Sequence, residues 1–249
     1  MSWDLRLGDC LDPTTGLASL PDKSVDVVIT DPPYEAEAHT PQRRVIRGRG
    51  SNGMRVAVVE PLSFEPMTAE VRSAVSEQFA RIARRWVVVF CQAEAIGQWR
   101  SCLEDAGLVW KRAAIWLKPD AMPQLTGDRP GTGYESIAVA HQAGRTKWNG
   151  GGKHGVWAFS TNKGAGCWEH EARHPTQKPE ALMEALVADF ADPGDLILDP
   201  FAGNGTTGVA AIRLGRRFIG WERDAKWHAG AVRRLRGAHE QLRMFEAAP

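Results

Sequence analysis

Short apolar runs rich in β-branched residues alternate along the chain with longer amphipathic stretches. This alternation is typical of helices packed on a largely parallel sheet. We expect strands at Trp3–Leu7, Val25–Thr30, Val87–Phe90, Ala113–Leu117, Ser136–Ala140, Leu196–Leu198 and Phe218–Trp221. We expect helices at roughly Thr68–Arg84, Ala93–Ala106, Pro179–Phe190, Thr206–Leu214 and Asp224–Met244. The pattern therefore predicts an α/β fold with one domain spanning residues 1–249.

Two long stretches interrupt this pattern. Residues 35–60 are polar and carry five Arg and no acid between Pro41 and Arg55. Residues 141–173 are rich in Gly and contain Trp148, Trp157 and Trp168. Loops of this length inside a compact domain are usually functional or disordered, so we expect the first to be a basic mobile loop and the second a functional insertion.

The composition limits the class of protein. With 249 residues and 43% hydrophobic side chains, the chain can bury a sizeable core without disulfides or metals. Its 31 basic and 30 acidic residues nearly cancel, so an anionic partner must bind to a local basic patch. The four Cys form no CxxC pair, and the chain shows neither a secretory leader nor a long apolar run. We therefore expect a protein of a reducing compartment, the cytoplasm.

The ten Trp fall into two groups. Trp86, Trp110, Trp116 and Trp221 are expected in the core of the sheet. Trp148, Trp157 and Trp168 have no predicted core to explain them.

The first candidate site is a Gly-rich turn at the end of a predicted strand, Asp199-Pro200-Phe201-Ala202-Gly203-Asn204-Gly205-Thr206-Thr207-Gly208. Its glycines allow a ligand close to the backbone, and the following helix begins with unpaired N–H groups. Glu222 lies 17 residues beyond Gly205, where an acid in a Rossmann-like unit accepts hydrogen bonds from ribose hydroxyls. A dinucleotide is disfavoured because the turn begins with Asp and lacks the full GxGxxG. The pattern favours an adenosyl cofactor without phosphates over an ordinary strand-turn-helix corner.

The second candidate site is Asp31-Pro32-Pro33-Tyr34, which follows the predicted strand Val25–Thr30. The two prolines remove two N–H donors, so carbonyl oxygens and the Asp31 carboxylate remain as acceptors for an amino group. Tyr34 offers a flat face for a base, a stacking contact worth about 1–3 kcal/mol in nucleic-acid sites. The alternative is a turn that contains Pro-Pro by chance, which the Gly-rich turn elsewhere in the chain makes less favoured.

Four blocks together resemble a known family, the amino-group DNA methyltransferases that use S-adenosylmethionine. Asp31–Tyr34 resembles its catalytic motif and Asp199–Thr207 its cofactor loop. His174-Pro175-Thr176-Gln177-Lys178-Pro179 is similar to the segment before that loop, and Gly8-Asp9-Cys10 to the corner that meets the adenine of the cofactor. Because the catalytic motif precedes the cofactor loop, the chain resembles the permuted β subgroup. The resemblance implies a Rossmann-like, seven-stranded, mostly parallel sheet with helices on both faces and one antiparallel strand, Ser136–Ala140.

The same resemblance implies the cofactor contacts. Glu222 would bind the ribose, Asp9 and Cys10 would form the adenine corner, and Phe201 would lie along the cofactor edge. The methionine end would be held by Thr176, Gln177, Lys178, Asp199, Ala202, Gly203, Asn204, Gly205 and Thr206, next to Asp31. Lys178 in particular would pair with the carboxylate of the cofactor.

The implied reaction is methylation of the exocyclic N6 of adenine in double-stranded DNA. Asp31 and the Pro32 carbonyl would accept hydrogen bonds from the amine, and Pro33 and Tyr34 would complete the catalytic motif. The methyl group would transfer by direct displacement to a base flipped out against Tyr34. A carbon-5 cytosine enzyme needs a Cys nucleophile, typically after Pro, and no Cys here follows Pro. Cytosine N4 and a non-catalytic, cofactor-binding DNA regulator remain as alternatives.

Contacts with DNA are expected on both long loops. Arg43, Arg44, Arg47 and Arg49 follow the catalytic motif, and Trp148 and Lys153 lie in residues 141–173, the family's target-recognition position. That insertion is short, so we expect recognition to be shared between the loops. A homodimer is compatible with the resemblance, and the sequence does not identify a restriction partner. Cys167, His170 and His174 have ligand-like spacing but lack a fourth ligand, so we expect no metal.

Overall fold

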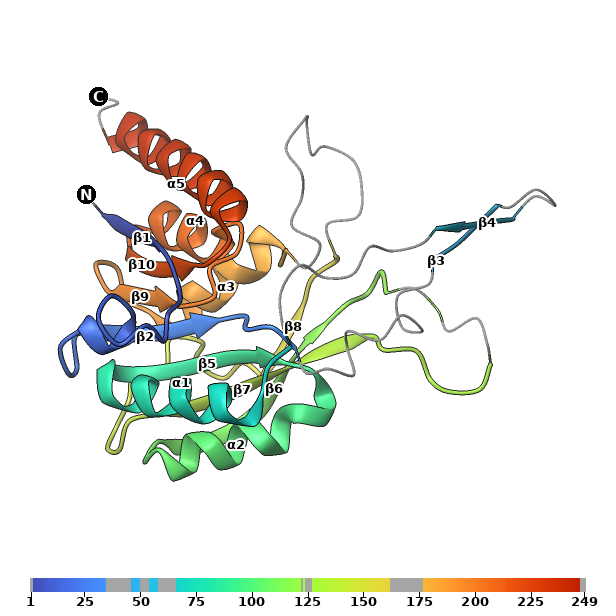
Figure 1. Ribbon diagram of the computed structural model, residues 1–249, viewed down its shortest axis with the longest axis horizontal. Coiled ribbons are helices and arrows are strands. Elements are labelled where there is room, and N and C mark those ends of the chain that lie inside the picture. Colours follow the sequence, from blue (N-terminus) through green and yellow to red (C-terminus); the bar gives the residue numbers. More distant parts are fainter. Residues whose placement is uncertain are drawn as a thin grey trace.

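The computed structural model describes residues 2–34, 66–121, 123, 127–161 and 177–246, together with strands 46–49 and 54–57. Most of this chain forms one mixed sheet with helices on both faces (Figure 1). In the described part of the chain, no helix combines the length and apolar character needed to cross a membrane.

Among the described residues, eight strands build the main sheet, in the order β1-β10-β9-β2-β5-β7-β6-β8. Their bounds are β1 Trp3–Leu7, β2 Val25–Thr30, β5 Ala83–Cys91, β6 Val109–Leu117, β7 Tyr134–His141, β8 Val156–Ala158, β9 Leu196–Asp199 and β10 Arg217–Glu222. Each of the seven predicted strands corresponds to one of these. The apolar runs of β2 and β5 suit central strands covered on both faces.

One strand runs against the others. β7 pairs antiparallel with β5 on one side and with β6 on the other, whereas the remaining pairs in the sheet are parallel. The predicted antiparallel strand, Ser136–Ala140, is therefore confirmed. The strand count is different, because β8 adds an eighth strand that pairs in parallel with β6. With three residues, β8 is too short to show an alternating pattern in the sequence.

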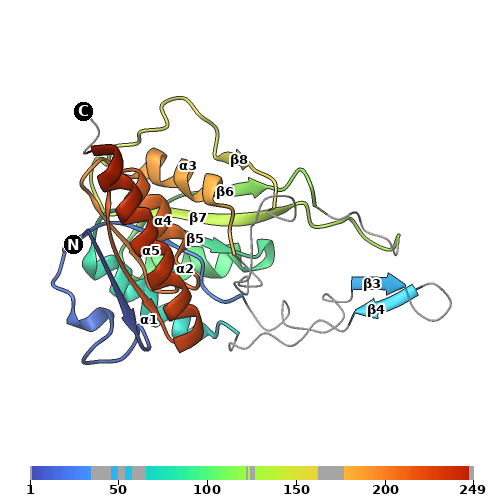
Figure 2. The ribbon, with the colours of Figure 1, turned by 90° about the horizontal axis from the view of Figure 1, so that it is seen from above.

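The helices form a layer on each face of the sheet (Figure 2). Apolar residues of α3, α4 and α5 pack on one face, and those of η1, α1 and α2 pack on the other. The helices are η1 Leu17–Ser19, α1 Ala69–Ile82, η4 Ala93–Ala95, α2 Ile96–Asp105, α3 Glu180–Phe190, α4 Thr206–Arg213 and α5 Ala225–Glu246. All five predicted helices are present.

Local chemistry explains where two of the helices begin. Thr68 caps α1, since its hydroxyl accepts a hydrogen bond from Val71 N at 3.3 Å. α4 begins after Gly205, whose φ of 74° is left-handed and favours glycine. The first turn of α4 is thereby placed directly behind the Gly-rich turn.

The order in which the chain adds strands to the sheet reverses at its centre. β9 and β2 are neighbours in parallel register, with Val28 opposite Leu198. From β9 the chain continues through α4 to β10, and from β2 it continues through α1 to β5, on the other side. In open α/β sheets, ligands bind beyond the carboxyl ends of the strands at such a switch point.

Part of the stretch 35–60 forms a two-stranded ribbon. β3 Ile46–Arg49 and β4 Met54–Ala57 pair antiparallel, with Arg47 opposite Val56. A short connection between strands of alternating character is typical of a hairpin. The ribbon extends from the side of the molecule at which β2 and β5 end (Figures 1 and 2).

The structure gives two of the unexplained tryptophans a core. Trp157 is 6% exposed, and Trp148 packs against the same cluster from the surface. The Trp148 ring lies edge-on to Phe190 at 5.0 Å and to Trp86 at 6.4 Å. The expectation that these two rings lack a core is therefore wrong, because residues 141–161 fold back onto the sheet. Trp168 lies outside the described residues.

Candidate active site

The two sequence motifs meet at the carboxyl ends of β2 and β9. Asp199 ends β9, and Asp31 follows directly after β2. Thr30 Oγ1 donates a hydrogen bond to Asp199 Oδ1 at 2.7 Å and joins the strand ends. The site lies at the central switch point, where the fold favours ligand binding.

Asp31 has one paired and one unpaired oxygen. Lys178 Nζ donates to Asp31 Oδ2 at 2.6 Å. Asp31 Oδ1 is buried and has no hydrogen-bond partner among the described residues. The pKa of Asp31 is raised to about 6, because burial, reinforced by the charge of Glu135, outweighs the opposing effect of Lys178. A buried acceptor without a donor is costly, and an incoming N–H group would relieve that cost.

Four charged or polar side chains surround Asp31 as a connected network. Glu135 Oε2 accepts a hydrogen bond from the Tyr34 hydroxyl at 2.5 Å and lies 3.1 Å from Lys178 Nζ. Glu135 Oε1 accepts from Lys118 Nζ at 2.5 Å. Burial alone would raise the pKa of Glu135, but Lys178 and Lys118 outweigh it and hold that pKa at about 2. Glu135 is therefore an anion at neutral pH.

Tyr34 and Lys178, two other members of the network, titrate outside the neutral range. Burial raises the pKa of the Tyr34 hydroxyl well above its ordinary value, and the anions Glu135 and Asp31 add to this. Burial would lower the pKa of Lys178, but Asp31 and Glu135 reverse the shift and raise it. Tyr34 is thus neutral and Lys178 charged.

The Gly-rich turn leads directly into α4. Gly203 and Gly205 have φ of 53° and 74°, and a Cβ on Gly205 would lie 3.0 Å from Ala231 Cβ. Asn204 Nδ2 donates to Gln177 Oε1 at 3.1 Å. Arg234 donates to the Asn204 carbonyl and, at 2.6 Å, to Glu180. These contacts bring Gln177 against the turn, and the binding of one ligand by the two segments stays a prediction.

Both carboxylate oxygens of Asp199 accept hydrogen bonds from within the protein. Its carboxylate accepts hydrogen bonds from Thr30, from Thr207 at 2.6 Å and from Phe201 N at 3.1 Å. The side chain is buried, and burial raises the pKa of Asp199 while these hydrogen bonds oppose the shift. Asp199 therefore shapes the turn, and a direct contact with the methionine end of a cofactor stays a prediction.

Glu222 and the Gly8-Asp9-Cys10 segment form an acidic corner beside the turn. β1 and β10 are neighbours, and Gly8 N donates to the Glu222 carbonyl at 3.0 Å. Glu222 Oε1 accepts from Asp224 N at 2.7 Å, and Asp9 Oδ1 accepts from Leu11 N at 2.8 Å. Burial raises the pKa of Cys10 to about 12, so its thiol is neutral. The structure thus brings together the residues predicted for the ribose and the adenine.

Lys178 has a partner that the sequence did not predict. The resemblance implies an ion pair with the carboxylate of the cofactor, whereas the described structure pairs Lys178 with Asp31 and Glu135. Only 7% of the Lys178 side chain is exposed, and its ammonium lies 5.3 Å from the Tyr34 ring centre. Its contacts therefore belong to the Asp31 network, and the implied contact with a cofactor stays a prediction.

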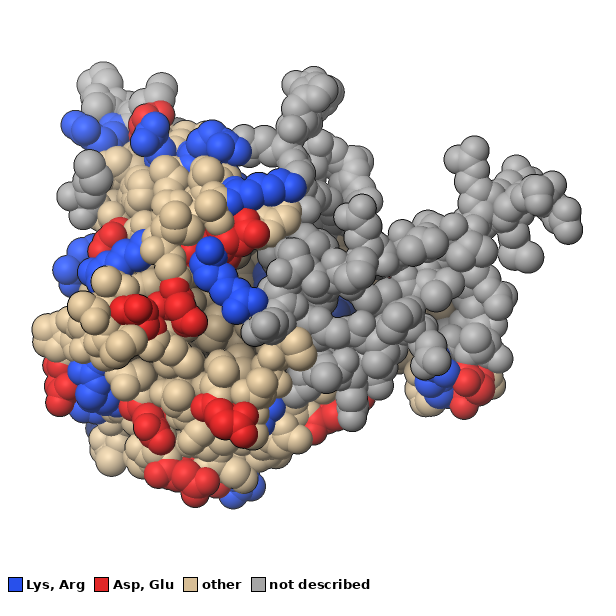
Figure 3. Space-filling view, in the orientation of Figure 1, with Lys and Arg blue, Asp and Glu red and all other residues tan. Residues whose placement is uncertain are grey.

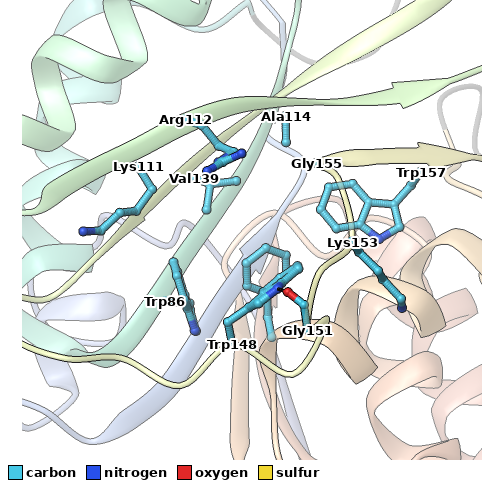
Figure 4. A pocket seen from close by; sticks show the side chains of 11 residues that line it. Trp86, Lys111, Arg112, Ala114, Val139, Trp148, Gly151, Lys153, Gly155 and Trp157 are labelled. Carbon is cyan, nitrogen blue, oxygen red and sulfur yellow. Dashed lines mark hydrogen bonds between the residues drawn. The ribbon is translucent and has the colours of Figure 1, made fainter.

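Trp148 and Lys153 lie in a different place, beside a cavity of about 270 Å³ (Figure 4). The cavity is lined by aromatic and basic side chains, among them Trp86, Trp148, Trp157, Lys111, Arg112 and Lys153. Trp86 belongs to the first half of β5, so this part of the cavity is away from Asp31. Lys153 Nζ pairs with Asp189 at 2.7 Å. DNA contact by Trp148 and Lys153 stays a prediction.

Several predicted positions lie outside the described residues: Thr176, Arg43, Arg44, Cys167, His170 and His174. Arg47 and Arg49 belong to β3.

Three residues of the site were not assigned from the sequence. Glu135 and Lys118 lie at the same edge of the sheet because β7 begins where β6 ends, with Trp116 opposite Glu135. A Lys after one strand and a Glu at the start of its antiparallel neighbour is the signal that could have paired them. Thr30 is the third of these residues. It is the last residue of β2, and nothing in the sequence distinguishes it from an ordinary strand residue.

Comparison with known proteins identifies the family of the chain. The family model for N6/N4 DNA methylases matches residues 25–233. Type II methyltransferase M.HinfI of Haemophilus influenzae is 28% identical over 92% of this chain and 67% of its own length. Type II methyltransferase M2.DpnII of Streptococcus pneumoniae is 28% identical over 90% of this chain and 87% of its own.

Solved structures share the fold. The M1.HpyAVI complex with S-adenosylmethionine covers 94% of this chain and 98% of its own, with a TM-score of 0.68 and 24% identity. The PvuII cytosine-N4-specific DNA methyltransferase covers 96% and 92%, with a TM-score of 0.69 and 15% identity. Because the family model spans most of the chain, including both motifs, the protein belongs to the N6/N4 DNA methylase family.

Proposed function

We propose that the protein is a site-specific DNA methyltransferase that transfers a methyl group from S-adenosylmethionine to the exocyclic N6 of adenine in double-stranded DNA. The observation that carries this proposal is the buried, unpartnered Asp31 Oδ1 beside the family's cofactor turn. An exocyclic amine carries N–H donors that fit such an acceptor. The DNA methylase family supplies the class of reaction.

The cofactor side of the site fits an adenosyl group. Gly203 and Gly205 add no side chains to the turn, and Glu222 offers a carboxylate for a ribose. The predicted holders Gln177, Asn204 and Thr206 lie at the start of α3 and α4. S-adenosylmethionine would supply an electrophilic methyl group bound to a sulfonium.

The chain's own residues act on the amine. Asp31 Oδ1 and the Pro32 carbonyl accept hydrogen bonds from its N–H groups. These hydrogen bonds localise on the nitrogen the lone pair that is otherwise delocalised into the ring. Lys178 holds Oδ2 and thereby fixes the direction of Oδ1. The Tyr34 ring, anchored through its hydroxyl to Glu135, offers a face to a flipped base. The N–H proton leaves the methylated amine for Asp31 or for water.

Adenine is preferred over cytosine because Asp begins the tetrapeptide. Cytosine N4 is the second candidate, favoured by the similarity in fold to the PvuII cytosine-N4-specific enzyme. A DNA regulator without turnover is disfavoured because all four residues Asp31–Tyr34 are present.

DNA would be held by local positive charge rather than by the whole surface. In the view of Figure 3, Lys and Arg are frequent over the α5 side, and Asp and Glu over the opposite half. Of the basic residues between Pro41 and Arg55, Arg47, Arg49 and Arg55 belong to the β3–β4 ribbon, which extends from the side of the molecule at which β2 ends (Figure 1). We assign phosphate contacts to Arg43, Arg44, Arg47 and Arg49. A homodimer is proposed from the resemblance alone, and a cytoplasmic location from the cysteine usage of the sequence. The sequence does not identify a restriction partner.

The test is identification of the methylated base. Purified protein is incubated with S-adenosylmethionine labelled in its methyl group and with unmethylated duplex DNA, which is then digested to nucleosides. We expect the label in N6-methyl-2′-deoxyadenosine. Label in N4-methyl-2′-deoxycytidine would select the second candidate, and no label in DNA would contradict both.

A further inference from the structure

A single carboxylate, that of Glu135, connects the groups around Asp31. It contacts Tyr34 from the end of β2, Lys178 from the segment before α3, and Lys118 from the end of β6. The Glu135 side chain is 15% exposed and stands at the start of β7. It therefore fixes three segments that are distant in sequence at one point.

We propose that Glu135 is a positioning residue for methyl transfer, which holds the Tyr34 ring and the Lys178 ammonium in the places that Asp31 and the target base require. This inference rests on the proposed function. Glu135 acts through Tyr34 and Lys178 and makes no contact with the reacting atoms.

The first part of the argument concerns the Tyr34 ring. Tyr34 follows two prolines, and its hydroxyl oxygen lies 2.5 Å from Glu135 Oε2. Short hydrogen bonds from a hydroxyl to an anion are roughly twice as strong as neutral ones. Lys178 and Lys118 keep Glu135 ionised, so this anchor is present at neutral pH. A stacking ring held at both its backbone and its tip loses little freedom when a base arrives.

The second part concerns charge. Asp31 and Glu135 are two largely buried anions, with side chains 20% and 15% exposed, and Lys178 and Lys118 are the cations that balance them. Lys178 Nζ lies between the two carboxylates, at 2.6 Å and 3.1 Å. Removing one partner of a buried ion pair leaves an uncompensated charge, which shifts the pKa of neighbouring groups. Glu135 therefore sets how strongly Lys178 acts on Asp31.

A purely structural role would give a different result. The charges that face Asp31 are Lys178 before α3, Glu135 on β7 and Asp199 on β9. If the amine needs an ionised Asp31, the transfer rate rises with pH as that carboxyl loses its proton. Changing one of these charges must then move the acidic limb of the rate profile, whereas a loss of stability alone lowers the active fraction and leaves the limb in place.

The experiment compares single-turnover methyl transfer from pH 5 to 8 in four variants of the full chain, with thermal unfolding measured in parallel. Glu135→Gln removes the charge but keeps an acceptor for Tyr34, and Glu135→Ala removes both. Tyr34→Phe removes only the hydroxyl. Lys178→Met removes the cation.

We expect the acidic limb to move to lower pH in both Glu135 variants, because an anion that raises the pKa of Asp31 is gone. It should move to higher pH in Lys178→Met, by about 1–3 units, because burial is then unopposed. Tyr34→Phe should lower the plateau rate and leave the limb unchanged. Glu135→Ala should have a plateau about ten-fold or more below that of Glu135→Gln, since it also frees the ring.

The inference is overturned if both Glu135 variants keep the wild-type limb and plateau, or if they lose only thermal stability. It is also overturned if Lys178→Met and Glu135→Gln move the limb in the same direction. A wild-type protein without any transfer would instead contradict the proposed function. The two failures are therefore distinguishable.

Discussion

Thr30 Oγ1 donates a hydrogen bond to Asp199 Oδ1 across 2.7 Å, between the ends of two parallel strands. Both side chains are buried, at 0% and 2% exposure. The bond joins the strand that carries Asp31 to the strand that leads into the Gly-rich turn. It therefore couples the amine-binding side of the site to the cofactor side.

Removing this hydroxyl should weaken the fold at that joint. Thr30→Val keeps the shape but deprives the buried Asp199 carboxylate of a donor, which should lower the free energy of unfolding by about 1–3 kcal/mol. Thr30→Ser retains the hydroxyl and serves as the control. Urea unfolding followed by circular dichroism measures both, and a Thr30→Val midpoint equal to that of wild type would show that the bond is not stabilising.

Glu222 should determine affinity for the cofactor. Glu222→Gln removes a charged acceptor for the ribose hydroxyls, and we expect S-adenosylmethionine to bind about 10–100-fold more weakly. Isothermal titration calorimetry without DNA measures this directly. Glu240→Gln makes the same chemical change at an exposed position on α5 and should bind like wild type. Equal affinities in the two variants would remove Glu222 from the cofactor site.

The packing of Trp148 predicts a contrast between two nearby glycines. A Cβ on Gly150 would lie 2.1 Å from the Trp148 ring, which Trp86, Trp157 and Phe190 hold in place. A Cβ on Gly152 would meet no atom within 4 Å. Gly150→Ala should therefore cost about 1–3 kcal/mol of stability, and Gly152→Ala should be nearly neutral. Thermal unfolding of the pair tests this, and a Gly150→Ala protein as stable as Gly152→Ala would contradict it.

The basic stretch after the catalytic motif should carry phosphate contacts. The double variant Arg43→Ala/Arg44→Ala should weaken duplex binding and reduce the slope of log K against log salt by about 2. Fluorescence anisotropy from low to moderate salt gives that slope. Lys153→Ala is the informative comparison: a slope lower by about 1 would support its predicted DNA contact, and an unchanged slope would assign it to the Asp189 ion pair alone.

Elements with a strong periodic pattern were predictable, and short or long-range features were not. β2 and β5 stand out in the sequence as apolar runs rich in β-branched residues, and the five helices stand out because each repeats one period over several residues. β8 does not, because three residues show no period. The antiparallel direction of β7 came from the resemblance rather than from its own residues.

The candidate site divides in the same way. Asp31, Tyr34, Gly203, Gly205 and Glu222 belong to motifs that are local in the chain, so the sequence could single them out as candidates. The two partners of Lys178 are distant from it in the sequence. Asp31 lies 147 positions away, and Glu135 belongs to another strand. Contacts of this kind arise from strand order and register, which no local pattern contains. Trp148 and Trp157 were misjudged for the same reason, since their core comes from β5, α3 and β8.

The most direct test of the central claim is single-turnover transfer of labelled methyl from S-adenosylmethionine to unmethylated duplex DNA, by wild type and by Asp31→Ala, with cofactor affinity measured for both. We expect wild type to label the DNA. Asp31→Ala should label it at least about 100-fold more slowly, with similar cofactor affinity, because the acceptor for the amine is gone. Equal labelling by the two proteins, or none by wild type, would contradict the account.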